Sequence, residues 1–396
     1  MKYLIQLGII TGIFIILNSC NSTKNETELT NIYIDVNSSD EAKRSEIFKL
    51  KDIIRLETNK DNLLNTIFRI IPNDDYLIIN TSLYDYKGNF INKIGRKGKG
   101  PGEYLSIFGA VWLDNNKIRL LDRTQKKVMD YKIDGEYIKE YKIGVWGQAY
   151  KYWNGYNFIF TETSVNEFNK SLFVFDSSFT MVGNLLEFDV SDNYKSIFQS
   201  SNFLVYEDSL RFFHAFTNYI YDLKVSEGIF TLNPRYYMDF GQNTMPESFL
   251  DQSFEDISKF FEAINKTNYA HSLNGYFETP VNVYYFFRCN KFFHLLIYSK
   301  DNKKTRVINR IHDDILFNGL NFNVTDEFSS YFYYDNKVFF VVQAYQFKEN
   351  LDTIKNQLTL EKWDEYCFTN PNIINIYKNI KIDDNPIIVV FELQQQ

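Results

Sequence analysis

The sequence predicts an all-β fold: a six-bladed β-propeller with a helical insertion between two blades and a short helical segment before the last strand. Three observations support it. Aromatic residues make up 18% of the 396-residue chain, and its apolar residues fall in short runs rather than helical stripes. Six such runs each follow a turn containing Asn, Asp or Gly. The pattern returns about every 45 residues, the length of a four-stranded propeller blade.

The six turns are the first element of this pattern. Asn, Asp and Gly tolerate the tight or left-handed backbone of a turn, and the β-branched and aromatic residues that follow suit strands. Each turn therefore predicts a hairpin. The turns lie at Asp74-Asp75, Asn115-Asn116, Asn154-Gly155, Glu207-Asp208, Asn290-Lys291 and Asp335-Asn336.

An internal alignment strengthens the repeat. Residues 114–132 align without a gap on residues 206–224, and the alignment matches two residue pairs, Arg119 with Arg211 and Asp130 with Asp222. A sheet of this size cannot bury its faces alone and must stack on neighbours around a ring. An Asp expected in the third strand recurs with spacings of 45, 46 and 46 residues, at Asp85, Asp130, Asp176 and Asp222.

Two segments depart from this rhythm and are predicted to be helical. Within residues 244–268 apolar side chains recur at helical spacing, and Thr244 with Glu247 fits a capping box, so we expect an insertion between the fourth and fifth blades. A less regular helical stretch within residues 348–380 precedes the final strand at 387–393. The early strand at 53–56 is predicted to complete the last blade, so that both chain ends share one sheet and the ring has no open edge.

The N-terminus is typical of an exported lipoprotein. Residues 1–19 have one cation and an apolar run that is short and interrupted for a membrane span, which needs about 20 residues, so they are predicted to be a signal peptide. The tetrad Leu17-Asn18-Ser19-Cys20 resembles a bacterial lipobox, which predicts a diacylglycerol on the Cys20 thiol. Residues 20–46 are polar and predict a lipidated flexible tether, followed by the propeller over 47–396. An uncleaved N-terminal anchor is the alternative.

Charge and cysteine content narrow the function. The formal net charge is −7, and loss of residues 1–19, with Lys2 as their one charged side chain, gives −8. A chain this acidic lacks the electrostatic footprint of a nucleic-acid-binding protein, so no nucleic-acid partner is expected. Once Cys20 carries lipid, Cys289 and Cys367 remain. Cys289 stands among phenylalanines and is expected to be a buried thiol rather than half of a disulfide.

The glycine-rich stretch INKIGRKGKGPGEYLSI, residues 91–107, is not a nucleotide-binding loop. Pro101 follows Gly100 where a P-loop has its lysine, and Glu103 stands where a dinucleotide fingerprint has its third glycine. We expect the glycines to let the chain cross from the first blade into the second. The alternative is a loop whose cations meet an anionic sugar, a carboxylate or a lipid head group, with the ligand-facing residues Arg96, Lys97, Lys99, Glu103 and Tyr104.

The sequence predicts no catalytic residue, cofactor or metal site. Its four histidines show none of the usual metal-ligand spacings, and no nucleophile elbow is present. His214 and His294 are expected in corresponding strands of the fourth and fifth blades. Carboxylate pairs for glycoside hydrolysis remain open, because 50 acidic residues allow many pairs. Core packing is favoured over sugar stacking for the tryptophans at positions 112, 146, 153 and 363.

Several segments together carry a family resemblance. They are the lipobox and the stretches LKDIIRLET (50–58), YDYKGNFI (84–91), IGRKGKGPGEY (94–104) and DDNPIIVVFEL (383–393). They resemble the six-bladed β-propeller lipoproteins of Bacteroidota, whose blades are similar to NHL repeats. The resemblance covers essentially all of the mature chain and implies an envelope lipoprotein, without supplying catalytic residues.

We therefore expect a cell-envelope lipoprotein whose propeller binds or scaffolds a glycan, a peptide or an envelope protein. The helical insertion is the element expected to touch a partner. The alternative is a propeller enzyme, a lyase or a glycoside-acting hydrolase, with its site at the channel mouth. Asn21 stands after Cys20 in place of an Asp that would retain a lipoprotein at the inner membrane, so we expect the outer membrane, facing the periplasm or the cell surface.

Overall fold

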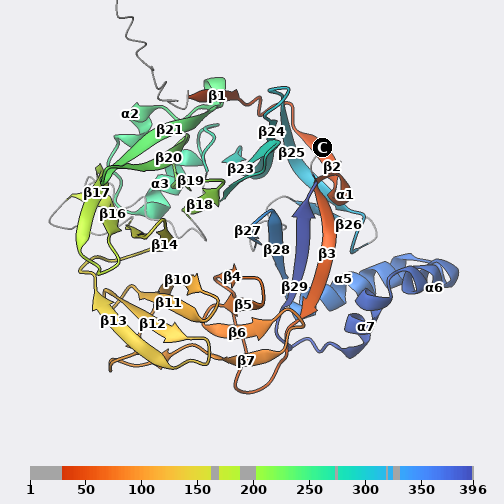
Figure 1. Cartoon of the computed structure of the whole chain (residues 1–396). Coiled ribbons are helices and arrows are strands. Elements are labelled where there is room, and N and C mark those ends of the chain that lie inside the picture. The colour runs from red at the N-terminus through yellow and green to blue at the C-terminus, as the bar shows by residue number, and fades with distance from the viewer. Residues whose placement is uncertain are drawn as a thin grey trace, which may run out of the picture.

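A ring of six β-sheets forms the molecule (Figure 1). The structure is a computed structural model that describes residues 29–161, 169–187, 202–272, 275–317, 320–323 and 331–394. Each sheet contains a four-stranded meander that runs from the axis outward, so the fold is the predicted six-bladed β-propeller.

The first three blades follow one another directly along the chain. Blade 1 comprises β4 (Ile70–Pro72), β5 (Tyr76–Ile79), β6 (Ser82–Asp85) and β7 (Phe90–Lys93). Blade 2 comprises β10 (Ile107–Asp114), β11 (Lys117–Asp122), β12 (Lys127–Lys132) and β13 (Tyr137–Lys142). Blade 3 comprises β14 (Ala149–Trp153), β15 (Tyr156–Phe160), β16 (Lys170–Phe175) and β17 (Met181–Glu187).

The other three blades receive strands from elsewhere in the chain. Blade 4 comprises β18 (Phe203–Tyr206), β19 (Ser209–Phe212), β20 (Tyr219–Ser226) and β21 (Ile229–Asp239). Blade 5 comprises β22 (Tyr276–Glu278), β23 (Asn282–Cys289), β24 (Phe292–Ser299) and β25 (Thr305–Asp313), with β26 (Leu320–Asn323) beside β25. Blade 6 comprises β27 (Tyr331–Tyr334), β28 (Lys337–Val342), β29 (Ile387–Leu393) and β3 (Phe48–Arg55).

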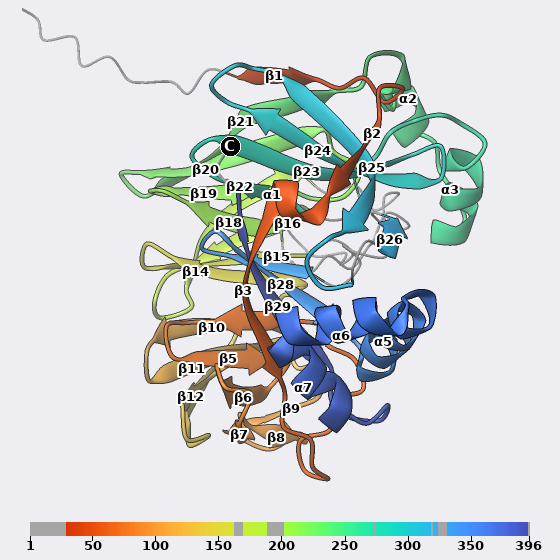
Figure 2. The same ribbon diagram turned by 90° about the vertical axis from the view of Figure 1, so that its right-hand side faces the viewer.

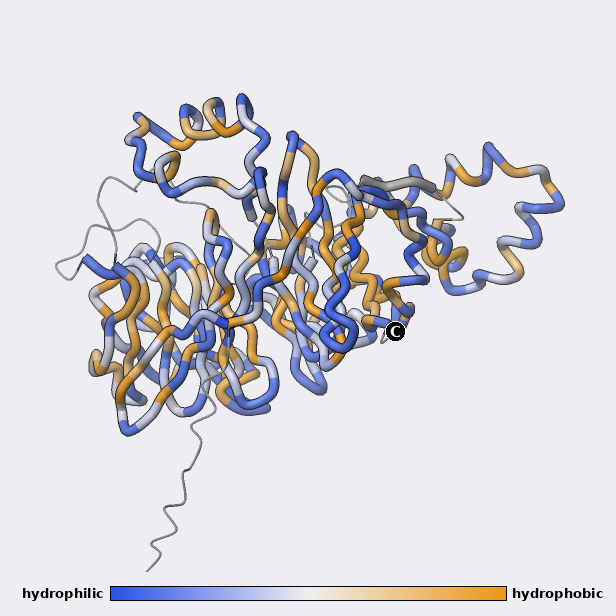
Figure 3. The backbone as a smooth tube through the Cα atoms, turned by 90° about the horizontal axis from the view of Figure 1, so that it is seen from above, coloured by the Kyte–Doolittle hydropathy of each residue, from blue (hydrophilic) through white to orange (hydrophobic). Residues whose placement is uncertain are grey.

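Side-chain alternation explains why the blades stack. In β15 the fully buried Phe158 and Phe160 pack with blade 4, whereas Ile159 between them packs with blade 2. Each middle strand thus supplies apolar side chains to two interblade layers, as a strand with a two-residue period must when both faces are covered. Figure 3 shows hydrophobic residues along the strands of the ring.

Blade 6 closes the ring as predicted. Strand β3, from the N-terminal part of the chain, lies antiparallel to the C-terminal strand β29, with a register that runs from Phe48 opposite Leu393 to Arg55 opposite Ile387. This pairing joins the two chain ends in one sheet. This pairing closes the ring, although each blade keeps short edges at its inner and outer strands.

Residues 30–46 are structured, whereas the sequence predicted a flexible tether over 20–46. Strand β1 (Thr30–Tyr33) pairs in parallel with the outer strand of blade 4, and β2 (Asp40–Lys43) pairs in parallel with the outer strand of blade 5. Helix α1 (Arg44–Ile47) then leads into β3. In this segment Ile32, Ile34 and Val36 are buried and the residues between them are exposed. This alternation is typical of a strand, but the polar composition of the segment as a whole indicated a tether.

The interblade insertion contains two short helices rather than one long helix. After the 3₁₀ turn η2 (Gly241–Asn243), α2 (Glu247–Leu250) and α3 (Ile257–Ile264) are separated by residues 251–256. A new N-cap at Asp256, whose side chain accepts a hydrogen bond from the Lys259 N–H at 2.9 Å, starts α3. Thr244 does not cap α2, because its hydroxyl accepts a hydrogen bond from the Phe240 N–H.

The second helical segment is longer and lies inside blade 6. Helices α5 (Ala344–Gln357), α6 (Leu360–Thr369) and α7 (Pro371–Asn379) join β28 to β29. Phe347, Leu351 and Ile354 anchor α5 on the main hydrophobic core. No helix in the described ranges is both long and apolar enough to span a lipid bilayer.

One of the six predicted turns connects different strands from those expected. Asn290 and Lys291 join β23 to β24, the second and third strands of blade 5, whereas the other five turns join first strands to second strands. In blade 5 the first hairpin turn is at residues 279–281. His214, just after a second strand, and His294, in a third strand, therefore do not occupy corresponding strands.

Candidate functional site

The two faces of the ring differ in the length of their connections. In a four-stranded meander, the turn between the second and third strands and the crossing to the next blade lie on the same face. We call it the insertion face, because α2 and α3 occupy the crossing from blade 4 to blade 5, and α5–α7 occupy the second turn of blade 6. Figure 2 shows both groups of helices on the same side of the ring. Long loops on a rigid scaffold are where propellers place binding residues.

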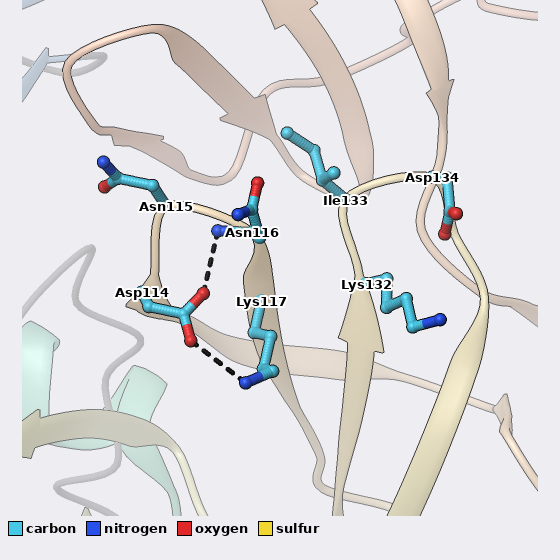
Figure 4. Close-up of a pocket in the computed structure, with 7 residues that line it drawn as sticks. All are labelled: Asp114, Asn115, Asn116, Lys117, Lys132, Ile133 and Asp134. Atoms are coloured by element: carbon cyan, nitrogen blue, oxygen red, sulfur yellow. Dashed lines mark hydrogen bonds and ion pairs between the residues drawn. The ribbon is translucent and has the colours of Figure 1, made fainter.

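The opposite face consists of short turns and carries an open cleft on blade 2 (Figure 4). Two neighbouring hairpins line it, with the residues Asp114, Asn115, Asn116, Lys117, Lys132, Ile133 and Asp134. Its cations already have partners, since Lys117 lies 3.3 Å from Asp114 and Lys132 lies 2.7 Å from Glu136. The cleft therefore offers little unsatisfied charge to a ligand.

The glycine-rich loop lies on the insertion face, at the crossing from blade 1 to blade 2. It folds back on itself, so that the two-residue strands β8 (Arg96–Lys97) and β9 (Glu103–Tyr104) pair in parallel. A Cβ at Gly98 would lie 2.0 Å from a carboxylate oxygen of Glu103, so a side chain there would displace that carboxylate. The loop thus makes the crossing that the sequence predicted.

The five residues predicted to face a ligand have different environments. Arg96, Lys97 and Lys99 are exposed, and Arg96 forms a 2.8 Å ion pair with Glu103. The carboxylate of Glu103 also accepts a hydrogen bond from the Gly100 N–H at 2.9 Å; this bond, together with Arg96, lowers its pKa. Tyr104 is buried at 8% exposure, with its hydroxyl 3.2 Å from that of Thr81. Tyr104 is therefore part of the core, because its ring packs between blades 1 and 2.

An aromatic and cationic group beside this loop was not predicted. Trp146, on the crossing from blade 2 to blade 3, is 41% exposed, although core packing was favoured for the tryptophans. The Arg123 guanidinium carbon lies 5.4 Å from the centre of the Trp146 ring and 4.7 Å from that of Phe108. The Lys126 ammonium lies 5.9 Å from Trp146. Gly144 and Gly147, which flank Trp146, could have indicated its exposure, because glycines beside a tryptophan are typical of a loop rather than of a strand core.

Two further cations lie at the innermost layer of the ring. Arg69 immediately precedes β4 and Lys151 lies in β14, both half-buried. Burial lowers the pKa of Lys151 to about 8 and that of Arg69 to about 10. Neither forms an ion pair with a carboxylate in the described part of the chain.

Buried ion pairs join neighbouring blades and are fully engaged. The Arg119 guanidinium donates to Asp130 within blade 2 at 2.5 and 2.7 Å, and to the Asn157 side-chain oxygen of blade 3 at 3.0 Å. Tyr150 also donates to that oxygen, at 2.6 Å. Because every partner lies inside the protein, this group holds two blades together and is not exposed to a ligand.

Glu278 is the centre of an equivalent group between blades 4 and 5. It is 1% exposed and accepts hydrogen bonds from Arg211 at 3.0 Å, Tyr236 at 2.8 Å and Tyr276, and Lys300 lies 2.6 Å away. Burial alone would raise the pKa of Glu278, but the charges of Arg211 and Lys300 lower it. The carboxylate is therefore held ionised between two cations as a structural anchor.

The histidines and the two described cysteines form no metal-binding group. In the parts of the chain that the structure describes, no three His, Cys, Asp or Glu side chains are grouped to hold a metal ion. Burial lowers the pKa of His271 to about 4, so it is neutral at pH 7. Cys289 and Cys367 are free thiols, and Cys289 is 1% exposed, as expected for a small buried apolar side chain.

The comparison with protein families identifies the chain. A model described as a domain of unknown function, DUF4934, matches residues 29–392. The chain belongs to this family. No curated protein matches this chain.

Two solved structures show the fold of this DUF4934 propeller in other sequences. One is a Bacteroides fragilis protein named only as a candidate exported protein, with a TM-score of 0.69 and 18% identity over 93% of this chain and 100% of that one. The other is a member of the DUF4221 family from Bacteroides vulgatus, with a TM-score of 0.51 and 9% identity over 88% of this chain and 98% of that one. At these identities the likeness concerns the fold alone.

Two predictions stay predictions. Cys20, the expected lipid attachment site, lies outside the described residues. The alternative of a lyase or hydrolase at the channel mouth is supported by none of the groups described above.

Proposed function

We propose that the chain is a cell-envelope lipoprotein, anchored through a lipid on Cys20, whose propeller binds or scaffolds an envelope protein or glycan through its insertion face. The observation that carries the proposal is the placement of both helical insertions on that one face. Because the insertions lie outside the blades, their sequence and length can vary without altering the core of the ring.

The helices supply surfaces suited to a protein partner. On α6, Leu360 is 77% exposed and Phe368 is 87% exposed, whereas Trp363 and Tyr366 turn inward and stack with their ring centres 5.6 Å apart. Large apolar side chains gathered on an exposed element are a common feature of protein-binding surfaces. Helix α3 presents a charged outer surface, with Lys259 and Glu262 more than half exposed.

The sequence supports the location. The apolar N-terminal run and the lipobox favour export and lipidation, and Asn21 favours the outer membrane, facing the periplasm or the cell surface. The similar Bacteroides fragilis protein is itself named as a candidate exported protein. A β-propeller on a lipid anchor can present a rigid ligand-binding face beside a membrane.

The test is affinity capture of the tagged full-length lipoprotein from detergent-solubilised envelopes, with mass spectrometry of what co-purifies. The variant Leu360→Ser with Phe368→Ser should lose a stoichiometric partner, because it removes the exposed apolar surface of α6. The matched control is Ile229→Ser, which removes a 66% exposed apolar side chain at a short turn on the opposite face. A Cys20→Ala chain should lose those partners that require the membrane. Equal capture by the α6 variant and wild type would contradict a role for α6, and capture of nothing by any chain would contradict a protein scaffold.

A further inference from the structure

We propose that the insertion face of blade 2 binds an acidic polysaccharide, a glycan that carries carboxylate or sulfate groups. The inference rests on the proposed function, because it names a ligand class for one sector of the insertion face. We call this sector the blade 2 patch and define it by Arg96, Lys97, Lys99, Arg123, Lys126 and Trp146.

The patch is one continuous surface rather than two separate loops. The Gln125 side-chain amide donates to the Glu103 carbonyl at 2.9 Å and to the Gly98 carbonyl at 3.3 Å, which fastens the glycine loop to the 123–126 turn. The Ile143 N–H donates to the Lys126 carbonyl at 2.9 Å and fixes the start of the segment that carries Trp146. These hydrogen bonds hold the cations and the tryptophan in place before a ligand arrives.

Among the local carboxylates, Glu103 pairs with Arg96 of the patch at 2.8 Å, and Asp122 and Glu140 are engaged inside the protein, which leaves the patch cationic. Asp122 is fully buried and accepts hydrogen bonds from the Leu105 N–H at 2.7 Å and from the Gln125 side chain at 2.8 Å. Glu140 pairs with the buried Lys127 at 2.8 Å. Lys97 and Lys99 form no ion pair with any described carboxylate. A cationic sector on a chain of net charge −7 gives an anionic ligand a favourable place to bind.

The arrangement of the patch favours an extended polyanion. The glycine loop lies over the outer strands, since Gly102 abuts the Tyr137 ring of β13, whereas Phe108, beside Arg123, belongs to the inner strand β10. β10 and β13 are three interstrand spacings apart, a distance of about 14 Å. The cations of the glycine loop lie beside those of the 123–126 turn, and such a row of charges matches a chain with repeated charges better than a single head group.

Trp146 offers a contact for the sugar ring, in addition to the contacts that the cations offer for its acidic groups. An exposed indole presents an apolar, electron-rich face against which the C–H groups of a sugar ring can pack. Lysine and arginine beside it can form charge-assisted hydrogen bonds with carboxylate or sulfate oxygens. An acidic sugar satisfies both at once, whereas a neutral glycan would use the ring alone.

The test measures binding of polygalacturonate, chondroitin sulfate and neutral dextran to the soluble mature domain and the full-length lipoprotein by calorimetry, at low and high salt. We expect both acidic polymers to bind, dextran to bind at least tenfold more weakly, and affinity to fall with added salt. Lys97→Gln with Lys99→Gln, and separately Trp146→Ala, should each weaken binding about tenfold or more. The matched control is Lys117→Gln with Lys132→Gln, two lysines of the opposite face that should change nothing.

Several outcomes would overturn the inference: no binding of either acidic polymer, equal binding of dextran, or equal loss in the control variant. Vesicles containing phosphatidylglycerol serve as a further arm, and binding to them but not to the polysaccharides would assign the patch to lipid. Thermal melting confirms that each variant is folded, as expected for substitutions of exposed side chains. A chain that captures its envelope partner through α6 but binds no acidic glycan would contradict this inference alone, and the reverse result would contradict the protein scaffold alone.

Discussion

Arg119 in β11 and Asp130 in β12 lie directly opposite each other and form a two-pronged ion pair that is almost fully buried, with N–O distances of 2.5 and 2.7 Å. Arg211 and Asp222 form the corresponding pair in blade 4, at the same register position of β19 and β20. Each arginine also reaches into the next blade, to Asn157 or to Glu278. The pair therefore links strands within a blade and blades within the ring.

Breaking this pair should destabilise the propeller strongly. Asp130→Leu leaves the Arg119 charge buried without its partner, so we expect a loss of about 3–5 kcal/mol in the free energy of unfolding. Replacing both residues, with Arg119→Met and Asp130→Leu, should cost clearly less than the sum of the two single changes, because no buried charge remains. Urea unfolding of the four proteins measures this. Additive losses would mean that the two residues act independently.

The internal alignment matched the residues of this pair between blades 2 and 4 without predicting the ion pair, and the regular aspartate spacing was misleading. Asp130 and Asp222 lie within third strands and bind arginines, whereas Asp85 and Asp176 stand at the ends of third strands and accept turn N–H groups, from Lys87 and Asn89 in one case and Ser178 and Thr180 in the other. In blade 2 the position that corresponds to Asp85 is held by Lys132. The backbone N–H of each of these two residues donates to the carbonyl of the residue four positions further along the chain. The spacing of about 45 residues was correct as the length of a blade. The four aspartates nevertheless have two different roles, because two of them bind an arginine and two of them accept hydrogen bonds in a turn.

Other features could not be predicted because they depend on contacts between residues that are far apart in the sequence. The strand pattern of residues 30–36 is too short to show which sheet edge it joins, and the outer strands of blades 4 and 5 are hundreds of residues away. Trp146 was favoured as a core residue because aromatic composition cannot distinguish a ring packed between blades from one on a crossing loop. The cations of the glycine loop were found from sequence, but their continuity with Arg123 and Lys126 depends on Gln125.

The glycine loop should be intolerant of side chains at Gly102. Its φ is +66°, and a Cβ there would lie 2.6 Å from the Tyr137 ring, so Gly102→Ala should incur both backbone strain and a clash. Gly155→Ala is the matched control, since its φ is +81° but nothing lies within 4 Å. We expect the control to cost about 1 kcal/mol and Gly102→Ala to cost about 2–3 kcal/mol. Thermal melting of both variants measures the difference, and equal melting temperatures would show that the Tyr137 contact relaxes freely.

Acidification should destabilise the protein through His271. Burial lowers the folded pKa of His271 to about 4 from the ordinary 6.5, so between these values the unfolded chain binds more protons than the folded chain. Stability should therefore fall as the pH is lowered from about 6.5 to 4, by up to about 3 kcal/mol from this residue. His271→Phe removes the titrating group and should flatten the dependence over that range. Melting temperatures at several pH values test it, and parallel curves for the two proteins would contradict it.

The N-terminal strand β1 should contribute to folding although it precedes the first blade. Ile32 is 0% exposed in the main core, next to the outer edge of blade 4, while its neighbour Tyr33 is 63% exposed. Ile32→Ser removes a buried apolar side chain and places a hydroxyl in the core, so we expect a loss of about 2–5 kcal/mol, whereas Tyr33→Ser should cost less than about 1 kcal/mol. Urea unfolding of the mature domain compares them. If Ile32→Ser costs as little as Tyr33→Ser, residues 30–33 detach without cost and behave as the tether that their composition suggested. A large difference means that the propeller begins well before its first blade, which shortens the segment between Cys20 and the folded domain.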